Sequence, residues 1–192
     1  MSFGDGMEIG SRANAPDFEL VREFVSGEAA AFDRLYERHS TCVYNTCLGI
    51  LGNPDDARDA MQDTFVQVYR SLPKFRGQSG FSTWLYRITV NKCMDMIQSR
   101  PKWEQADSIE FPGEEDPVGD PLLEEHVRRT ILRLKAEFRV VLVLYYFQQL
   151  SYEEIAESLG WSLNQVRIRL HRGRKAFRLI YGGNEDEVQA DI

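Results

Sequence analysis

The chain has 192 residues and a formal net charge of −7, and 43% of its residues are hydrophobic and 28% charged. This balance is typical of a folded globular protein and excludes a chain that is disordered over most of its length. The longest apolar run, 140–147, is far shorter than the ~18 residues of a membrane-spanning helix, and the N-terminus resembles no secretion signal. We therefore expect a cytoplasmic protein without membrane insertion.

The charge is distributed in blocks along the chain. Residues 70–102 carry seven Lys or Arg side chains and one acid, whereas residues 104–125 carry nine acids and no base. Residues 161–181 carry six bases and no acid, and the tail that follows is acidic. Two basic blocks separated by an acidic one predict two surfaces that meet a polyanion, joined by a segment that avoids it.

The three cysteines, Cys42, Cys47 and Cys93, are odd in number and form no CxxC motif. This usage favours free thiols within helix packing in a reducing compartment. A zinc site that combines His39 with Cys42 and Cys47 is the alternative. It is disfavoured because structural zinc sites have four ligands and more tightly paired spacing. We expect neither a metal nor another cofactor.

Apolar residues recur at intervals of three and four through most of the chain, which is typical of amphipathic helices. In the first half, this pattern predicts helices from Phe18 to Val25, from Phe32 to Ile50, from Pro54 to Leu72 and from about Ser82 to Ser99. Asn53 can cap the third of these helices, and Pro54 suits its first position. A loop is expected over residues 73–80, and a further helix from Glu124 to Phe147.

The helical pattern fails between residues 100 and 121, where prolines and acidic residues concentrate. We therefore predict an all-α protein of two small helical domains, 16–100 and 122–181, joined by an acidic, proline-rich linker at 101–121. Residues 1–15 are expected to form a disordered N-terminal extension, and residues 182–192 an acidic tail.

Two short helices near the C-terminus carry their start signals in the sequence. Ser151 and Glu154 form one capping box, Gly160 ends the helix that follows, and Ser162 and Gln165 form a second box. Two capped helices across a glycine-containing turn predict a helix-turn-helix. In the second helix, the apolar positions that should face inward are Val166, Leu170, Gly173, Phe177 and Ile180.

The second helix of a helix-turn-helix lies in the major groove of DNA, with its N-terminal residues at base edges. Arg matches the two acceptors of guanine, and basic residues further along the helix suit phosphates. A basic helix alone is most often only a solvated surface, but in this position it predicts DNA contact. The expected contacts are Ser162, Asn164, Arg167, Ile168, His171, Arg172, Arg174, Lys175 and Arg178.

The stretch LSYEEIAESLGWSLNQVRIRLHRGRKAF resembles region four of the extracytoplasmic-function (ECF) sigma factors, the compact branch of the sigma-70 family. The stretch DDARDAMQDTFVQVYRSLPKFRGQSGFSTWLYRITVNKCMD resembles region two of the same family. Together with their flanks, the two stretches cover nearly all of residues 18–180, in the order that the family has.

The resemblance implies a sigma factor and not an enzyme. Such a protein would bind core RNA polymerase, through the clamp of the largest catalytic subunit and through the flap. It would direct DNA-templated transcription initiation at promoters of a stress or envelope regulon. The 16–100 domain would dock on polymerase and melt the minus-ten element, and the 122–181 domain would bind the minus-thirty-five element. An anti-sigma factor is a further expected partner.

The resemblance also implies roles for two groups of residues in the first half. The polar face of the third helix, which by itself would indicate only solvation, would dock on the clamp coiled coil through Asp56, Asp59, Gln62, Asp63 and Gln67. The loop and helix after it would hold an everted base of the minus-ten element, because a flipped base needs stacking and edge contacts. Those residues are Arg76, Gly77, Gln78, Ser79, Arg87, Asn91 and Lys92. Trp84 is expected in the core.

The sequence departs from the family at several positions. Lys135 stands where proline is usual, Asn164 and Gln165 replace Gly-Thr, and Ile168 replaces a small hydroxyl residue. Gly173 stands where Ala is common, at a cost of ~1 kcal/mol inside a helix. These changes leave the expected fold intact, but they prevent the transfer of a particular minus-thirty-five sequence from relatives.

Three other classes of protein were considered. A helix-turn-helix regulator that is not a polymerase subunit, such as a response regulator, needs a strand–helix receiver, and residues 1–100 show no strand pattern. A helical module that only binds proteins would give no promoter-specific transcript with core polymerase. An enzyme is disfavoured because His39, His126 and His171 are scattered, with no nucleophile or metal cluster beside them.

Overall fold

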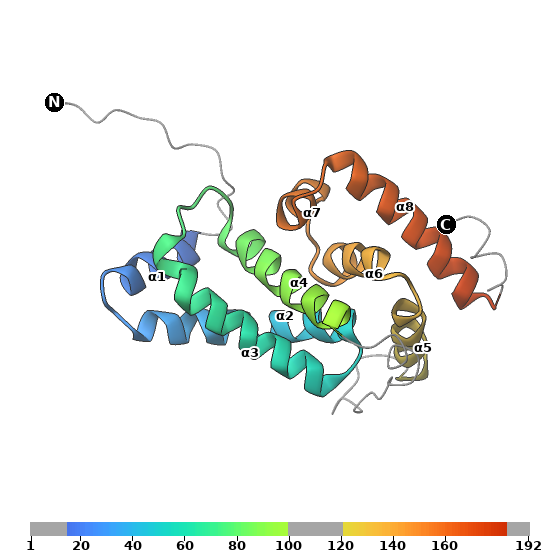
Figure 1. The fold of residues 1–192 in the computed structure, drawn as a ribbon, viewed down its shortest axis with the longest axis horizontal. Helices are drawn as coiled ribbons and strands as arrows, with labels where there is room; N and C mark the ends of the chain where they lie inside the picture. Colours follow the sequence, from blue (N-terminus) through green and yellow to red (C-terminus); the bar gives the residue numbers. More distant parts are fainter. Residues whose placement is uncertain (1–14, 100–120, 184–192) are drawn as a thin grey trace.

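The computed structural model describes residues 15–99 and 121–183, and this part of the chain contains helices and no β-strand (Figure 1). The first group consists of α1 (Ala15–Val25), α2 (Ala30–Leu51), α3 (Pro54–Ser71), the short 3₁₀ helix η2 (Leu72–Lys74) and α4 (Phe81–Ser99). The second consists of α5 (Pro121–Leu132), α6 (Ala136–Leu142), the π-helical turn η4 (Val143–Phe147), α7 (Tyr152–Leu159) and α8 (Leu163–Tyr181). The two groups form the two helical domains that the sequence predicts. None of the described helices combines the length and apolar character that a membrane crossing requires.

Local signals set the start of α3 as predicted. The Asn53 side-chain oxygen accepts hydrogen bonds from the backbone N–H groups of Asp55 at 2.9 Å and Asp56 at 3.0 Å. Pro54 occupies the first turn, where its missing N–H costs no helical hydrogen bond. The two aspartates lie at the positive end of the helix dipole, which favours their charge.

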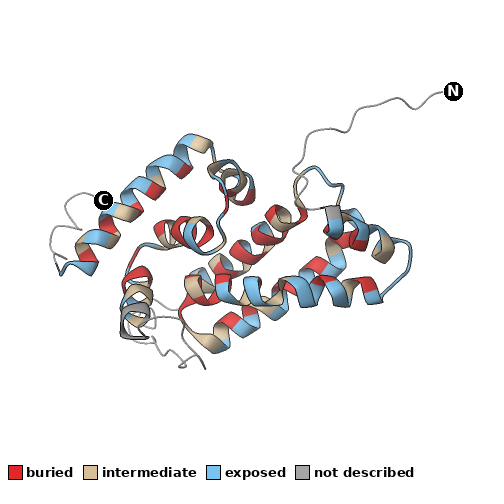
Figure 2. Ribbon diagram, turned by 180° about the vertical axis from the view of Figure 1, so that it is seen from behind, coloured by how far each residue is buried: buried red, intermediate tan, exposed pale blue. Residues whose placement is uncertain are grey.

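In the first domain, α2, α3 and α4 each pack against the other two. The buried residues of the domain lie on the inward faces of its helices (Figure 2). Leu35 and Ile50 of α2, Val68 of α3, and Phe81 and Leu85 of α4 are all at most 1% exposed. The strands of a receiver domain are absent from residues 15–99, so the response-regulator alternative is excluded for this part of the chain.

A buried carboxylate fastens α1 to α2. Asp17 is 4% exposed, and it accepts hydrogen bonds from Arg38 at 2.6 Å and His39 at 3.1 Å. Burial by itself would raise the pKa of Asp17. The hydrogen bonds from His39 and Arg38, together with their charges, outweigh burial and hold this pKa below its ordinary value.

The prediction of one helix from Glu124 to Phe147 is wrong. α5 ends at Leu132, the chain turns at 133–135, and α6 begins at Ala136. Lys135 has φ −55° and ψ 141°, which are angles that a proline would favour, so the chain turns here as it would at the usual Leu-Pro. The expected loop at 73–80 is shorter than predicted, because its first two residues belong to the single turn of η2.

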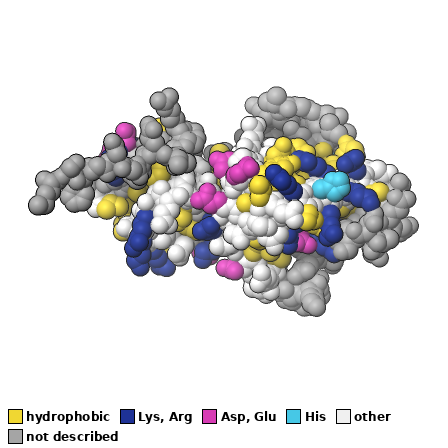
Figure 3. Space-filling view, turned by 90° about the horizontal axis from the view of Figure 1, so that it is seen from above, with side chains coloured by type: hydrophobic (Ala, Val, Ile, Leu, Met, Phe, Trp, Pro, Cys, Tyr) yellow, Lys and Arg dark blue, Asp and Glu magenta, His cyan; other side chains and the backbone are white. Residues whose placement is uncertain are grey.

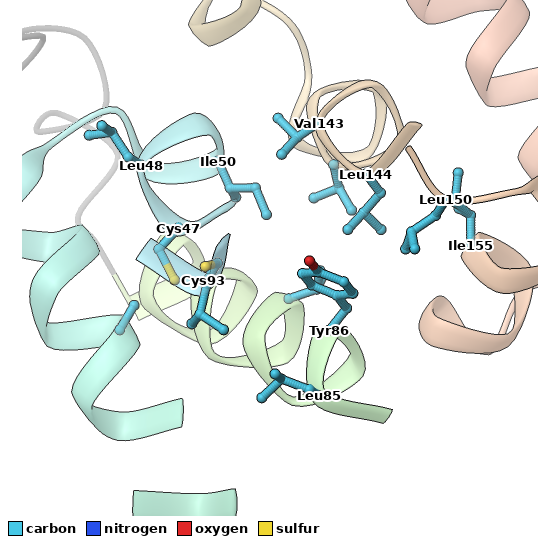
Figure 4. Packing of buried hydrophobic residues seen from close by; sticks show 14 of the residues in the cluster. Cys47, Leu48, Ile50, Leu85, Tyr86, Cys93, Val143, Leu144, Leu150 and Ile155 are labelled. Carbon is cyan, nitrogen blue, oxygen red and sulfur yellow. The ribbon is translucent and has the colours of Figure 1, made fainter. Parts of the chain in front are cut away.

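The two domains share one buried core, which the acidic sequence between them did not lead us to expect. Ile50 and Tyr86 of the first domain face Val143 and Leu144 of the second (Figure 4), and all four belong to one cluster of buried residues. The Tyr86 hydroxyl donates to the Gln148 side-chain oxygen at 2.8 Å. Burial, with the Cys42 thiol nearby, raises the pKa of Tyr86 and keeps this donor protonated.

Two further hydrogen bonds cross between α4 and α7. The Ser158 hydroxyl, 1% exposed, donates to the Thr83 carbonyl oxygen at 3.2 Å. The Arg87 guanidinium donates to the Glu157 carbonyl oxygen. Since α4 and α7 thus meet along their polar edges as well as through apolar side chains, the domains have a defined mutual orientation.

Arg139 joins the ends of two helices from different domains. One of its terminal nitrogens donates to the Ile50 carbonyl oxygen of α2 at 2.5 Å, and the other donates to the Leu132 and Leu134 carbonyl oxygens at 2.8 and 3.1 Å. Carbonyl groups at helix C-termini have no partner within their own helix and carry partial negative charge. A cation that donates hydrogen bonds therefore suits this position.

The predicted disordered extension (1–15), acidic linker (101–121) and acidic tail (182–192) lie outside the described residues, apart from Ala15, Pro121, Gly182 and Gly183. These three assignments, and the domain boundaries drawn from them, stay predictions.

Replacing Arg139 with Met should destabilise the protein by about 2–4 kcal/mol, because it leaves the Ile50, Leu132 and Leu134 carbonyl groups without this donor. Equilibrium unfolding in urea, followed by circular dichroism, measures the change. Arg70→Met is the matched control, since Arg70 is exposed on α3, and it should shift the free energy of unfolding by no more than about 0.5 kcal/mol. Equal effects of the two substitutions would contradict the role given to Arg139.

The Asp17 carboxylate should make the stability of the protein depend on acid pH. Its folded pKa lies below the unfolded value of about 3.9, so its contribution is complete above that value and is lost as the pH falls through the folded pKa. Asp17→Asn should lower the free energy of unfolding at pH 7 by about 1–3 kcal/mol and flatten its decline below pH ~4. Glu19→Gln, an exposed change on the same helix, should retain the wild-type slope. A wild-type slope in Asp17→Asn would refute the assignment.

Candidate nucleic-acid and polymerase interfaces

Both predicted capping boxes are present in the helix-turn-helix. The Glu154 backbone N–H donates to the Ser151 hydroxyl oxygen at 3.1 Å, and the Ser151 N–H donates to the Glu154 carboxylate at 2.8 Å. At α8, the Gln165 N–H donates to the Ser162 hydroxyl oxygen at 3.2 Å, and the Ser162 N–H donates to the Gln165 side chain at 2.8 Å. These reciprocal bonds fix the residues at which α7 and α8 begin.

The inward face of α8 packs against α6 as its apolar spacing predicts. Val166 and Leu170 are fully buried. At Gly173, the Cβ atom of an alanine would lie 3.3 Å from Phe138 Cβ and 3.4 Å from Leu142 Cδ1. Glycine therefore permits a closer approach of α8 to α6, which accounts for this departure from the family pattern.

The outward face of α8 is polar, basic and largely exposed. In the view from above, Lys and Arg side chains gather over α8, and acidic side chains lie over the neighbouring α7 (Figure 3). In the first half of α8, Ile168 adds a large exposed apolar side chain, at 42% exposure. The predicted residues that the structure brings onto this exposed surface are Ser162, Asn164, Arg167, Ile168, His171, Arg172, Lys175 and Arg178.

Arg174 differs from the other predicted DNA contacts, because tyrosines of the same domain hold it. Its Nε donates to the Tyr146 hydroxyl at 2.9 Å, and its guanidinium carbon lies 5.0 Å from the Tyr145 ring centre. Although burial would lower the pKa of Arg174, hydrogen bonds with Tyr152 and Tyr146 raise it overall. Arg174 thus connects α8 to η4 and α7, in addition to any contact it makes with DNA.

Arg169, which the sequence analysis did not single out, fixes the turn between α7 and α8. Its guanidinium lies 4.3 Å from the Trp161 ring centre, and its Nε donates to the Glu137 carboxylate at 2.8 Å. Cation–π contacts of this kind contribute about 0.5–1 kcal/mol at exposed sites. A tryptophan directly after the turn glycine, with an arginine on the next helix, was the available signal.

On α3, the predicted docking face is exposed at Asp59, Gln62, Asp63 and Gln67, while Asp56 is partly buried. The structure adds Val66, 47% exposed, one turn after Asp63 on the same side of the helix. A helical projection of the sequence could have found it, since residues three and four apart share a face. This face therefore combines carboxylates with exposed apolar area.

The predicted minus-ten residues occupy two adjoining elements. Arg76, Gly77 and Gln78 are exposed in the loop before α4, and Ser79 is partly exposed there. On α4, Arg87 and Asn91 are exposed one turn apart, and Lys92 is partly buried. The Arg87 side chain turns towards α7, where it donates to the Glu157 carbonyl oxygen. The structure thus keeps the loop accessible but engages Arg87 between the domains.

Trp84 packs against the core, as expected. Its ring lies 4.8 Å from that of Phe75 and 5.8 Å from that of Phe81, between ring centres. Phe81 itself is 1% exposed. Phe81 is therefore not placed to stack on an everted base, whereas Trp84 is partly exposed, and the loop remains the candidate for that contact.

The cysteines are unpaired in the described part of the chain. Cys47 and Cys93 are buried between α2 and α4 (Figure 4), and Cys42 is exposed. A hydrogen bond with the Cys47 thiol, together with burial, raises the pKa of Cys93. Among the described residues, no three His, Cys, Asp or Glu side chains converge as metal ligands would.

Comparison with known proteins places these features in a family. The family described as Sigma-70 region 2 matches residues 35–102, and that described as Sigma-70, region 4 matches residues 125–177. The ECF RNA polymerase sigma factor SigW of Bacillus subtilis is 32% identical over 174 residues, which cover 82% of this chain and 92% of SigW. SigE of Mycolicibacterium smegmatis, also named an ECF RNA polymerase sigma factor, is 36% identical over 80% of this chain and 63% of its own length.

A similar fold has been solved. A chain in the structure of CnrH in complex with the cytosolic domain of CnrY gives a TM-score of 0.69 at 27% identity, and the match covers 88% of the present chain and 99% of that one. Both sigma-70 regions are present in order, and the relatives match over most of the chain. The chain therefore belongs to the sigma-70 family and is an RNA polymerase sigma factor of the ECF type.

Proposed function

We propose that this sigma factor divides promoter recognition among three surfaces. The exposed face of α8 reads the minus-thirty-five element, the 75–80 loop with α4 captures the minus-ten element, and the polar face of α3 docks on core RNA polymerase. The observation that carries the proposal is the doubly capped helix-turn-helix, whose second helix exposes one basic face. Promoter-specific run-off transcription with purified core polymerase tests it directly.

For α8, the proposal follows from the position of each side chain along the helix. Asn164, Arg167, Ile168 and His171 lie in the first half, which enters the major groove in helix-turn-helix proteins. Arg172, Lys175 and Arg178 lie further along, where the helix leaves the groove and passes the phosphates. Ile168 cannot donate a hydrogen bond, so its exposed side chain suits a thymine methyl group.

For the minus-ten element, the exposed loop supplies polar contacts and backbone amides. Unstacking a base costs a few kcal/mol, which contacts to the extruded base must offset. Arg76 and Gln78 extend from the loop, and Ser79 and Gly80 lead into the N-terminus of α4, where the helix dipole favours negative charge. Asn91 and Lys92 extend the same surface along α4 towards the strand backbone.

For core polymerase, the α3 face offers both charge and apolar area. Asp59 and Asp63 would meet basic side chains of the clamp on the largest catalytic subunit, and Val66 would bury apolar surface beside them. The second domain would contact the flap. Binding of both domains to one polymerase would then set the distance between the two DNA-reading surfaces.

The remaining partner is a regulatory protein. The solved chain that this fold resembles is bound to the cytosolic domain of another protein, CnrY. We propose that a protein of the anti-sigma class covers the polymerase and DNA surfaces of this chain. Binding to polymerase and binding to the anti-sigma protein would both take place in the cytoplasm, where RNA polymerase acts.

Reversing the charge of Asp59 and Asp63 to Lys should weaken binding to core polymerase by at least about tenfold, the equivalent of ~1.4 kcal/mol. Thermal stability should stay nearly unchanged, because both side chains are exposed. Asp33→Lys with Glu37→Lys is the matched control, since these exposed acids lie one turn apart on α2. Titration of labelled protein with core enzyme gives the Kd values. Equal Kd values for the two double variants would exclude α3 as the docking face.

Arg167→Ala and Arg178→Ala should weaken transcription in different ways. An Arg forked onto guanine discriminates by ~1–3 kcal/mol, so loss of Arg167 should relax preference at one upstream position. Loss of Arg178 should weaken all promoters alike and flatten the salt dependence of binding. A promoter-library transcription profile separates the two patterns. If Arg167→Ala reduced transcription from every promoter by one common factor, α8 would bind DNA through its positive charge without reading sequence.

A further inference from the structure

The loop assigned above to base capture has few side-chain anchors of its own. Arg76, Gly77 and Gln78 at its tip are exposed, and Gly77 has φ +66°, in the left-handed region that favours glycine. Ordering an unsupported loop on binding costs conformational entropy at every residue that becomes fixed. Capture of a base therefore benefits from a support that holds the loop in place beforehand.

Phe18 of α1 supplies that support. Its ring stacks on the ring of Phe75 at the start of the loop, with ring centres 5.7 Å apart and planes inclined by 24°. A Cβ atom added to Gly77 would lie 2.8 Å from Phe18 Cε1, so the phenyl ring contacts the loop backbone closely at its tip. The N-terminal end of α1 and the loop lie side by side in the fold (Figure 1).

The position of Phe18 is in turn fixed by its neighbour in the sequence. Asp17 is held by Arg38 and His39, and the His39 ring lies 5.2 Å from the ring of Phe81, the first residue of α4. α1 is thus fastened to α2, whose His39 contacts the first residue of the helix that follows the loop, while Phe18 contacts the residues within the loop.

Phe75 completes this arrangement from the loop side. Its ring lies 6.0 Å from that of Phe81 and 4.8 Å from that of Trp84, so Phe18, Phe75, Phe81 and Trp84 form one aromatic platform beneath the loop. Aromatic pairs in such geometries contribute stability beyond that of their buried area. Three of the four rings come from the segment that resembles region two, whereas Phe18 lies 17 residues before the matched region begins.

We infer that Phe18 is a positioning residue for recognition of the minus-ten element. It holds the backbone of the 75–80 loop in its capturing conformation and makes no contact with DNA. The inference rests on the proposed role of that loop. It assigns to α1 a part in promoter melting that the charge and motif pattern of α1 does not indicate.

The test compares two ring deletions on α1. Phe18→Ala removes the support, and Phe24→Ala removes a similar ring that packs on Phe32 and Tyr69, at 5.8 and 5.1 Å between ring centres, far along the helix from the loop. Each full-length variant is assembled with core polymerase. Core binding is titrated, and strand opening is followed by permanganate reactivity of thymines, on a duplex promoter and on the same promoter with a pre-melted minus-ten element.

Phe18→Ala should leave the Kd for core polymerase within about twofold of wild type and reduce opening of the duplex promoter about tenfold or more. On the pre-melted promoter the defect should shrink, since the unpairing step is bypassed. Phe24→Ala should open the duplex promoter as wild type does, and Phe18→Tyr, which keeps the ring, should restore opening. Phe18→Leu keeps the apolar burial but not the flat stack, so it should stay folded by circular dichroism and still open DNA poorly.

Two outcomes overturn the inference. One is an equal loss of opening in Phe18→Ala and Phe24→Ala, which would indicate general loosening of the domain. The other is normal opening by both Phe18→Ala and Phe18→Leu, while a loop variant that combines Arg76→Ala and Gln78→Ala opens DNA poorly. That result would leave the proposed role of the loop intact. If the loop variant also opens DNA normally, the proposed role of the loop itself fails.

Discussion

Carbonyl groups at the ends of two helices need a donor that neither helix contains, and Arg139 supplies it to both. Its guanidinium reaches the last turn of α2 and the end of α5, so one side chain spans the two domains. Around it, Ile50, Tyr86, Val143 and Leu144 merge into one buried cluster. The orientation of α8 relative to α4 follows from this contact, because both helices are packed on the elements that Arg139 connects.

This packing also affects a residue that belongs to a proposed DNA surface. Arg87, assigned to the minus-ten element, donates to the Glu157 carbonyl oxygen of α7, the first helix of the helix-turn-helix. Arg174, assigned to the minus-thirty-five element, is similarly engaged by Tyr146. Each of these side chains has a partner within the protein that DNA would have to replace or share. Arg178, although exposed, also donates to the Arg174 carbonyl oxygen on α8, at 3.4 Å.

Local features of the fold could be predicted from the sequence, and long-range ones could not. The caps at Asn53, Ser151 and Ser162 depend on residues within three positions, so they were predicted correctly. The family and the two-domain architecture followed from motifs of the same local kind.

The contact from Arg139 to Ile50 joins residues 89 apart, and no periodicity indicates it. The break in the helix after Leu132 was missed for the same reason, because the carbonyl groups it exposes are satisfied by a side chain in the next helix. The exposed residues of α3 and α8 were found, but the internal partners of Arg174 depend on tertiary packing.

The shared core limits how this factor can be combined with others. Sigma factors invite the construction of chimeras, in which one promoter-reading module is exchanged for another. Here a foreign second domain would have to present a counterpart to Gln148 for the Tyr86 hydroxyl, and an apolar surface for Ile50. A chimera that exchanges only the recognition helix leaves this buried interface between the domains unchanged, whereas one that begins at α5 replaces one side of it. The buried interface therefore determines where a working chimera can be joined, and a junction in the linker between the motifs would disrupt it.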